Sequence, residues 1–253
     1  YEQYFAYLGR LLRGDLGESY QLRMPVSEVI ARQLMPTLQL TGLALLMALV
    51  IAFAVALLAR GRRARGAAAA IELIVLSSPV FWIGLLLLTV FSFTLGWFPV
   101  AGSRGFASLV LPAVTLALPC AARLGQVLRE GIEQVERQPF ALTVRARGAS
   151  DTRLLLRHTF RHGSTGALTL AGYLVGSLLG GAVLVETVFA RAGLGRVALT
   201  ASTDRDLPVV AGIIMLSAMV FVLVHLLVER ATPFLDPRLR MRAPEPASEG
   251  GPN

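Results

Sequence analysis

The sequence predicts an all-α membrane protein with five transmembrane helices. Hydrophobic residues make up 55% of the 253 residues and the mean hydropathy is +0.63, whereas a soluble domain contains roughly 45 to 50% apolar residues. The apolar residues gather in runs close to the roughly 20 residues that a helix needs to cross the hydrocarbon layer. All 24 basic residues are Arg, and they collect in the gaps between these runs. This distribution is typical of loops at the inner face of a membrane.

Residues 1–36 are predicted to form an interfacial region on the outer face of the membrane. Aromatic and Leu side chains recur at helical spacing between Tyr4 and Leu12, which indicates a helix that lies in the membrane interface or packs on other protein. A second short helical pattern follows Pro25 and ends at Pro36.

Five apolar segments follow and define a transmembrane domain over residues 37–229. Each is long enough to span the membrane, and none contains Asp or Glu. The third contains Pro112 and Pro119, which predict a kinked helix. The five predicted spans are 37–59, 73–95, 105–122, 163–185 and 207–228.

The charges between the spans predict their orientation. The loop at 60–66 holds four Arg and no acid, and the segment 123–161 holds eight Arg against four acids. Both are predicted to be cytoplasmic, because short cytoplasmic loops carry an excess of basic residues. The segments 96–104 and 186–206 have few or balanced charges, so they are predicted to lie outside.

This orientation also places the two ends of the chain. The tail at 230–253 is predicted to be cytoplasmic, and its Pro, Gly, Ser and Glu content predicts disorder. Residues 1–36 are left outside the cell. We therefore expect a sixth span upstream of Tyr1, which is not a Met.

The sequence contains no recognisable catalytic or metal-binding motif. There is no nucleophile elbow, phosphate-binding loop or zinc-type Cys/His spacing. His158 and His162 are four residues apart, but without a third ligand nearby they predict a solvated helix face. Cys120 is the only cysteine, so no intrachain disulfide can form. We expect no enzyme activity, metal or cofactor in this chain, and the placement of Arg between spans argues against a nucleic-acid partner.

Three ionisable residues lie at or near the ends of the predicted spans. Glu72 and Glu186 sit at span boundaries, where carboxylates usually pair or cap a helix. The absence of acids within the spans argues against a proton-coupled carrier and leaves sodium coupling open. His225 lies near the inner end of the last span, where it either has a function or reaches the interface.

Small residues mark one face of the span at 163–185. Small side chains on one stripe allow a second helix to approach closely. The pattern fits a contact within the chain, a contact with a second membrane subunit at the border of a conduit, or both. The predicted interface residues are Gly172, Gly176, Ser177 and Gly180.

A basic insert at residues 137–162 separates the third and fourth spans. Pro139 suits a first helical turn, Gly148 suits a helix C-terminus, and Ser150 with Asp151 suits the start of a second helix. The insert is therefore predicted to form a helix, a tight turn and a helix. Its apolar residues among Arg suit either anionic lipid or the groove of a partner protein.

The insert resembles the EAA loop of the membrane-spanning permeases of bacterial ABC importers for dipeptides, oligopeptides and nickel, and most closely the first permease subunit of the peptide systems. Gly148 occupies the family's glycine position, whereas Arg191, Ala192 and Gly193 stand where relatives have Trp-Pro-Gly. The resembling segments, in chain order, are GRLLRGDLGESY, PVSEVIARQLMPTLQL, LGWFPVAG, TVRARGASDTRLLLRHTFRH, LLGGAVLVETVFARAGLGR and LDPRLR.

The resemblance implies a pore-forming subunit in the bacterial inner membrane that works by alternating access. It also implies a second permease subunit, two ATPase subunits that bind ATP and Mg, and an extracytoplasmic substrate-binding protein, with lipid around the spans. An ion-coupled secondary carrier and a nickel-type ABC permease are the alternatives. The residues implied to couple to an ATPase are Phe140, Thr143, Arg145, Ala146, Arg147, Gly148, Ala149 and Ser150.

Overall fold

In the computed structural model of the chain, the described residues are 14–59, 61–103, 105–136 and 160–235. Within these ranges every regular element is a helix, and the one β-type pairing is an isolated bridge between Glu18 and Pro25. The all-α prediction is confirmed. In chain order the elements are α2 (Val26–Leu58), α3 (Gly61–Ser77), α4 (Val80–Leu87), the π-helix η1 (Leu88–Thr94), α5 (Ala107–Glu136), α8 (Phe160–Val188), α9 (Leu194–Thr203) and α10 (Leu207–Leu235).

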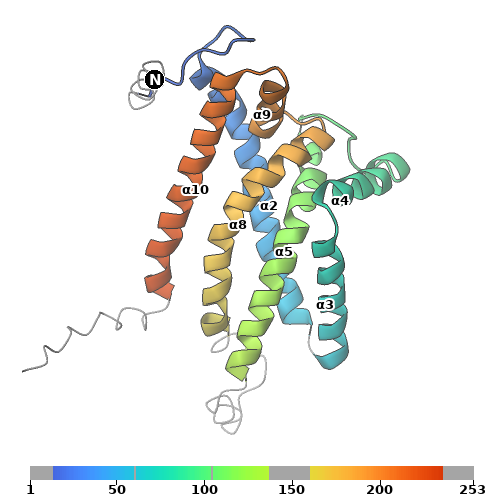
Figure 1. The fold of residues 1–253 in the computed structure, drawn as a ribbon. Helices are drawn as coiled ribbons and strands as arrows, with labels where there is room; N and C mark the ends of the chain where they lie inside the picture. The colour runs from blue at the N-terminus through green and yellow to red at the C-terminus, as the bar shows by residue number, and fades with distance from the viewer. Residues whose placement is uncertain (1–13, 60, 104, 137–159, 236–253) are drawn as a thin grey trace, which may run out of the picture.

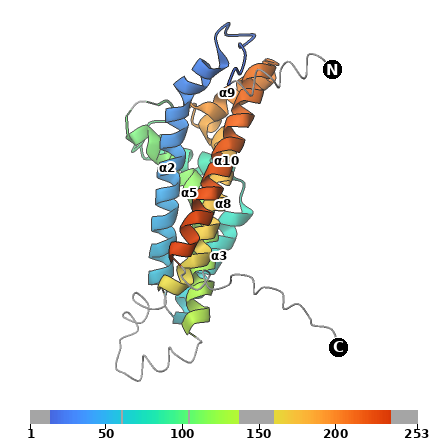
Figure 2. The same cartoon turned by 90° about the vertical axis from the view of Figure 1, so that its left-hand side faces the viewer.

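The long helices form an elongated bundle in which α5 and α8 pack against α2 (Figure 1). Helix α10 runs beside α8, and α3 lies beside α5 (Figure 1, Figure 2). The buried face of α2 presents Ala44, Ala48 and Ala52, which recur every four residues and are fully buried. These small side chains let α2 lie close to α5, because a methyl group separates two helices less than a longer side chain does.

Three helices are long and apolar enough to cross a membrane: Val26–Leu58, Ala107–Gln134 and Leu207–Arg230. The helices on either side of residues 78–79 pass the same test only together, as a pair bent by 105°. The apolar part of α8 within the searched residues is the shorter helix Gly172–Val188. The described residues thus show three candidate spans, or four if the bent pair is one span, and the predicted count of five is not confirmed.

The predicted span at 73–95 and the predicted loop at 60–66 are both wrong in detail. The span breaks at Ser78 and Pro79, because Pro79 has no backbone N–H and adopts an extended conformation (φ −62°, ψ 138°) that begins α4. The loop is instead the first turns of α3, which starts at Gly61. Arg and Ala dominate that stretch, and both residues favour a helix.

Three other predicted boundaries fall inside helices. Helix α2 runs through Pro36, so the short helix predicted before residue 36 and the first predicted span form one continuous helix. Helix α5 contains both of its prolines and continues past 122, because a buried apolar stripe of Leu124, Leu128 and Ile132 extends along it. Helix α10 extends to Leu235, so residues 230–235 are helical rather than part of the predicted tail. The three-region division otherwise stays a prediction, and 236–253 lie outside the described ranges.

The small-residue face of α8 packs in part against α10. A Cβ added to Gly172 would lie 2.5 Å from Val228 Cγ2, and one added to Gly176 would lie 2.5 Å from a carbon of the Phe221 ring. Gly180 has no atom within 4 Å of the same position, and Ser177 is exposed. Two of the four predicted interface residues therefore make an intrachain contact, whereas Ser177 is exposed and Gly180 has open space beside it.

We expect Gly176→Val to lower the thermal stability of the purified protein, because the added side chain must displace the Phe221 ring. Overpacking of this kind costs roughly 1 to 3 kcal/mol. The measurement is the midpoint of thermal unfolding in detergent. Gly180→Val is the matched control, since it adds the same side chain to the same helix in open space. Equal loss of stability in both variants would contradict the proposed contact.

Candidate functional site

The residues predicted to couple to an ATPase lie outside the described ranges, as does His158. They are Phe140, Thr143, Arg145, Ala146, Arg147, Gly148, Ala149 and Ser150. The helices that flank them are described: α5 ends at Glu136, and α8 begins at Phe160. These two ends lie side by side at the end of the bundle opposite α9 (Figure 1). We call this the inner end and the α9 end the outer end, because Arg-rich segments are retained in the cytoplasm.

The carboxyl group of Glu186 organises the outer end. The residue is fully buried in the last turn of α8. Its Oε1 accepts a 2.6 Å hydrogen bond from the Thr37 hydroxyl of α2, and its Oε2 accepts a 3.1 Å hydrogen bond from the backbone N–H of Arg196. Thr37 Oγ1 accepts a 2.8 Å hydrogen bond from the N–H of Leu194. We call these four groups the Glu186 cluster. In this cluster, side chains of α8 and α2 satisfy two backbone N–H groups in the first turn of α9.

Two glycines make room for the Glu186 cluster. A Cβ on Gly193 would overlap the Glu186 carboxyl group, and a Cβ on Gly195 would lie 2.5 Å from the Cα of Val183. The backbone at Gly193 is extended, so space rather than conformational freedom requires glycine there. The segment 186–196 therefore turns back on itself so that a carboxylate at the end of α8 caps the helix that follows.

Arg191 is a buried cation near this cluster. The residue is 3% exposed, and its Nε and one terminal nitrogen have no hydrogen-bond partner among the described residues. Burial lowers the pKa of the guanidinium, and the nearby Glu186 carboxyl group acts in the opposite direction. Arg191 thus adds a positive charge to a region that already holds a buried acid.

A second cluster joins the segment before α2 to the start of α10. The buried carboxylate of Asp206 accepts hydrogen bonds from the hydroxyl of Ser19 and from the backbone N–H groups of Tyr20 and Gln21. Burial acts to raise the pKa of Asp206, but these hydrogen bonds and one from the Val209 backbone together lower it below its ordinary value. We call this the Asp206 cluster; it ties together residues that are 187 positions apart.

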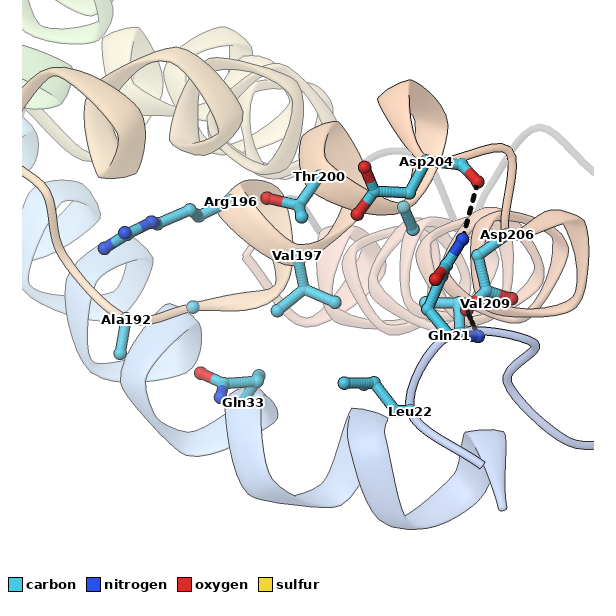
Figure 3. Close-up of a pocket in the computed structure, with 12 residues that line it drawn as sticks. Gln21, Leu22, Gln33, Ala192, Arg196, Val197, Thr200, Asp204, Asp206 and Val209 are labelled. Atoms are coloured by element: carbon cyan, nitrogen blue, oxygen red, sulfur yellow. Dashed lines mark hydrogen bonds between the residues drawn. The ribbon is translucent and has the colours of Figure 1, made fainter. Parts of the chain in front are cut away.

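A mostly apolar pocket of about 300 Å³ lies between the two clusters (Figure 3). Gln33 of α2 and Arg196 of α9 border one side of it, and Gln21 and Asp206 border the other. Gln21 closes part of that side by donating a 3.2 Å hydrogen bond from its side-chain amide to the backbone oxygen of Asp204. The Oε1 atom of Gln33 is buried and has no hydrogen-bond partner in the part of the chain that the structure describes.

The inner end is held by ion pairs between α3 and α5. Arg129 donates through two guanidinium nitrogens to both oxygens of the buried Glu72 carboxylate. Arg65 pairs with Glu133 at 3.2 Å, one turn further toward the insert. The two pairs fix the last turns of α5 against α3, immediately before the chain enters the insert.

Sequence reasoning identified part of this arrangement. The prediction that Glu72 and Glu186 pair or cap is confirmed. The partners Thr37 and Arg129 could not be named, because pattern analysis does not show which helix faces another. The Asp206 cluster was missed; the only local signal is an acid directly before the first turn of a helix, which is typical of an N-cap. Among the described residues no three metal-ligating side chains come together.

Most of the chain also matches a known family of membrane transport proteins. The family model described as "Binding-protein-dependent transport system inner membrane component" matches residues 22–241. Glutathione transport system permease protein GsiC from Escherichia coli (strain K12) is 34% identical over 245 residues, which cover 96% of this chain and 80% of the relative. GsiC from Salmonella choleraesuis (strain SC-B67) is 32% identical over 243 residues, with 95% and 79% covered.

Solved structures share the fold at lower identity. A chain of the MetNI methionine ABC transporter in an inward-facing conformation aligns with a TM-score of 0.70 and 17% identity, covering 81% of this chain and 95% of that chain. A crystal structure described as an amino acid ABC transporter with histidines aligns with a TM-score of 0.59 and 17% identity, covering 92% and 98%.

We expect Glu186→Gln to lower the melting temperature of the purified protein. An amide offers one acceptor where the carboxylate offers two, so either Thr37 or the Arg196 N–H loses its partner. A buried group left without a hydrogen bond costs roughly 1 to 3 kcal/mol. Glu28→Gln is the control, since Glu28 makes an exposed pair with Arg32, and such pairs contribute little. Wild-type melting of Glu186→Gln would show that the cluster does not stabilise the outer end.

The Asp206 cluster predicts a pH dependence of stability. Because the pKa of Asp206 is lowered on folding, its contribution is fully present above the ordinary value of 3.8 and is lost as the pH falls through the folded value. We expect Asp206→Asn to melt below the wild type at neutral pH, and the difference to shrink only below that ordinary value. A difference that vanished near pH 6 would contradict the assignment.

Proposed function

This chain belongs to the family of inner membrane components of binding-protein-dependent transport systems, and we propose that it is the pore-forming permease of an ATP-driven importer for small peptides. The main observation that supports this proposal is the 34% identity to GsiC over 96% of the chain. Glutathione is a tripeptide, so this relative supports a peptide-like substrate. The family places the chain in the bacterial inner membrane as a multi-pass protein.

The proposed assembly contains this permease, a second permease subunit, two ATPase subunits and a binding protein outside the cytoplasm. The description of the family names a binding protein, and solved structures that share the fold are ABC transporters. In the proposal the ATPases bind ATP and Mg, and this chain contributes no catalytic group. Its role is to change conformation when the ATPases do.

The proposed mechanism is alternating access, with the insert at 137–162 as the contact to an ATPase. Helices α5 and α8 lead into and out of the insert and run the length of the bundle. A displacement of the insert therefore acts directly on two helices that span the molecule. ATP can bias the pore only if the insert's contacts differ between the open and closed states of the ATPases.

The polar contacts fix α5 and α8 to different neighbouring helices at the two ends of the bundle. At the inner end, the Glu72–Arg129 pair fixes α5 to α3, so that both move together with the insert. At the outer end, the Glu186 cluster fixes α8 to α2 and α9. The proposal is that these units shift relative to one another while each keeps its internal contacts.

Reconstitution tests the proposal. The chain is purified with its co-encoded permease and ATPases, inserted into liposomes and supplied with the binding protein and labelled di- and tripeptides or Ni²⁺. We expect peptide to be taken up only when ATP is present on the cytoplasmic side of the membrane. Uptake of Ni²⁺ alone would assign a nickel system. Uptake driven by an ion gradient without ATPase subunits would contradict the proposal and favour a secondary carrier.

We expect Gly148→Val to uncouple ATP hydrolysis from uptake. A glycine at a helix C-terminus typically adopts a left-handed conformation, which costs a β-branched residue about 1 to 2 kcal/mol. Peptide uptake per ATP hydrolysed should fall roughly 5- to 30-fold. Gly66→Val is the control, because Gly66 lies in α3 with open space around it. Wild-type coupling in the Gly148 variant would remove the turn from the mechanism.

A further inference from the structure

A groove of about 440 Å³ lies between α5, α8 and α10, away from both end clusters. Arg123 of α5 lines it, together with Tyr173 and Ser177 of α8 and Ser217 and Phe221 of α10. The volume falls within the range of small-molecule sites, which is roughly 300 to 1,000 Å³. The groove is therefore large enough to hold part of a small peptide.

Arg123 is unusual because it lies within a helix that can span the membrane. It falls near the middle of Ala107–Gln134, although the sequence had suggested a boundary there. Arg123 is exposed, and in the described ranges no carboxylate forms an ion pair with its guanidinium group. Arginine keeps its charge in proteins, and a charged side chain facing lipid is costly. This face of α5 must therefore border water or protein.

The other polar groups of the groove are hydrogen-bond donors. Tyr173, Ser177 and Ser217 each carry a hydroxyl group. The ring of Phe221 forms part of the wall, and the imidazole of His225 stacks on that ring with centroids 6.2 Å apart and planes 12° apart. Among the residues that the structure describes, no acidic residue lines the groove. A guanidinium with several hydroxyl donors is the chemistry that binds a carboxylate.

We propose that this groove binds a carboxylate of the transported peptide during its passage, with Arg123 as the main ligand. The inference rests on the proposed function, since it requires a peptide substrate. A peptide always presents a terminal carboxylate unless that group is modified, so one fixed guanidinium serves substrates with different side chains. The same carboxylate chemistry could be supplied by an acidic side chain of the second permease, and the test separates these two sources.

The test compares a tripeptide that has a free C-terminus with the same tripeptide as its C-terminal amide. Both are supplied to the reconstituted complex at concentrations that saturate the binding protein, so that the comparison reports on the permease. We expect Arg123→Gln to lower uptake of the acid roughly tenfold or more, as expected for the loss of one charge-assisted hydrogen-bonded pair. Uptake of the amide should change little. Arg123→Lys should restore part of the preference for the acid.

Arg62→Gln is the matched control, since Arg62 is an exposed arginine at the start of α3, and we expect it to leave the acid-to-amide ratio unchanged. An equal loss of acid and amide uptake in Arg123→Gln would assign the carboxylate to the second permease and overturn the proposal. No loss of either would overturn it as well. A wild-type complex that imports no peptide would instead contradict the proposed function, and with it this inference.

Discussion

The buried carboxyl group of Glu186 is the constraint on which the outer half of the molecule depends. A carboxyl group without water or partners is costly to bury, and here its partners come from α2 and from the first turn of α9. Gly193 and Gly195 supply the space that this arrangement needs. The position of α9 therefore depends on the Glu186 side chain and on the two glycines that leave room for it.

The contacts of the bundle differ in kind along its length. Both ends are held by directional polar contacts, the Glu186 and Asp206 clusters outside and the Glu72–Arg129 pair inside. Between them α8 meets α10 through Gly172 and Gly176, with apolar side chains opposite. Apolar contacts are less directional than hydrogen bonds, so the seam between α8 and α10 is better able to slide than either end. The groove beside Arg123 opens along this seam.

Hydropathy alone predicted the all-α class and the positions of most long helices, because membrane-spanning segments must be apolar and helical throughout. The break at Pro79 was missed because the apolar run continues across it, although proline itself was the available signal. The charge of Arg123 predicts a span boundary, because a charge normally ends an apolar run, whereas the helix continues through it. The pairing of Ser19 with Asp206 could not be predicted, since periodicity carries no information about contacts between distant segments.

We propose that the Glu186 cluster keeps α2 and α9 in one rigid unit while the transporter cycles. Double electron–electron resonance between spin labels at the exposed positions Ala31 of α2 and Leu199 of α9 measures this directly. We predict one narrow distance distribution that is the same with and without ATP, and a broadened one in Glu186→Gln. A distribution that shifts when ATP binds to the wild-type complex would contradict the claim.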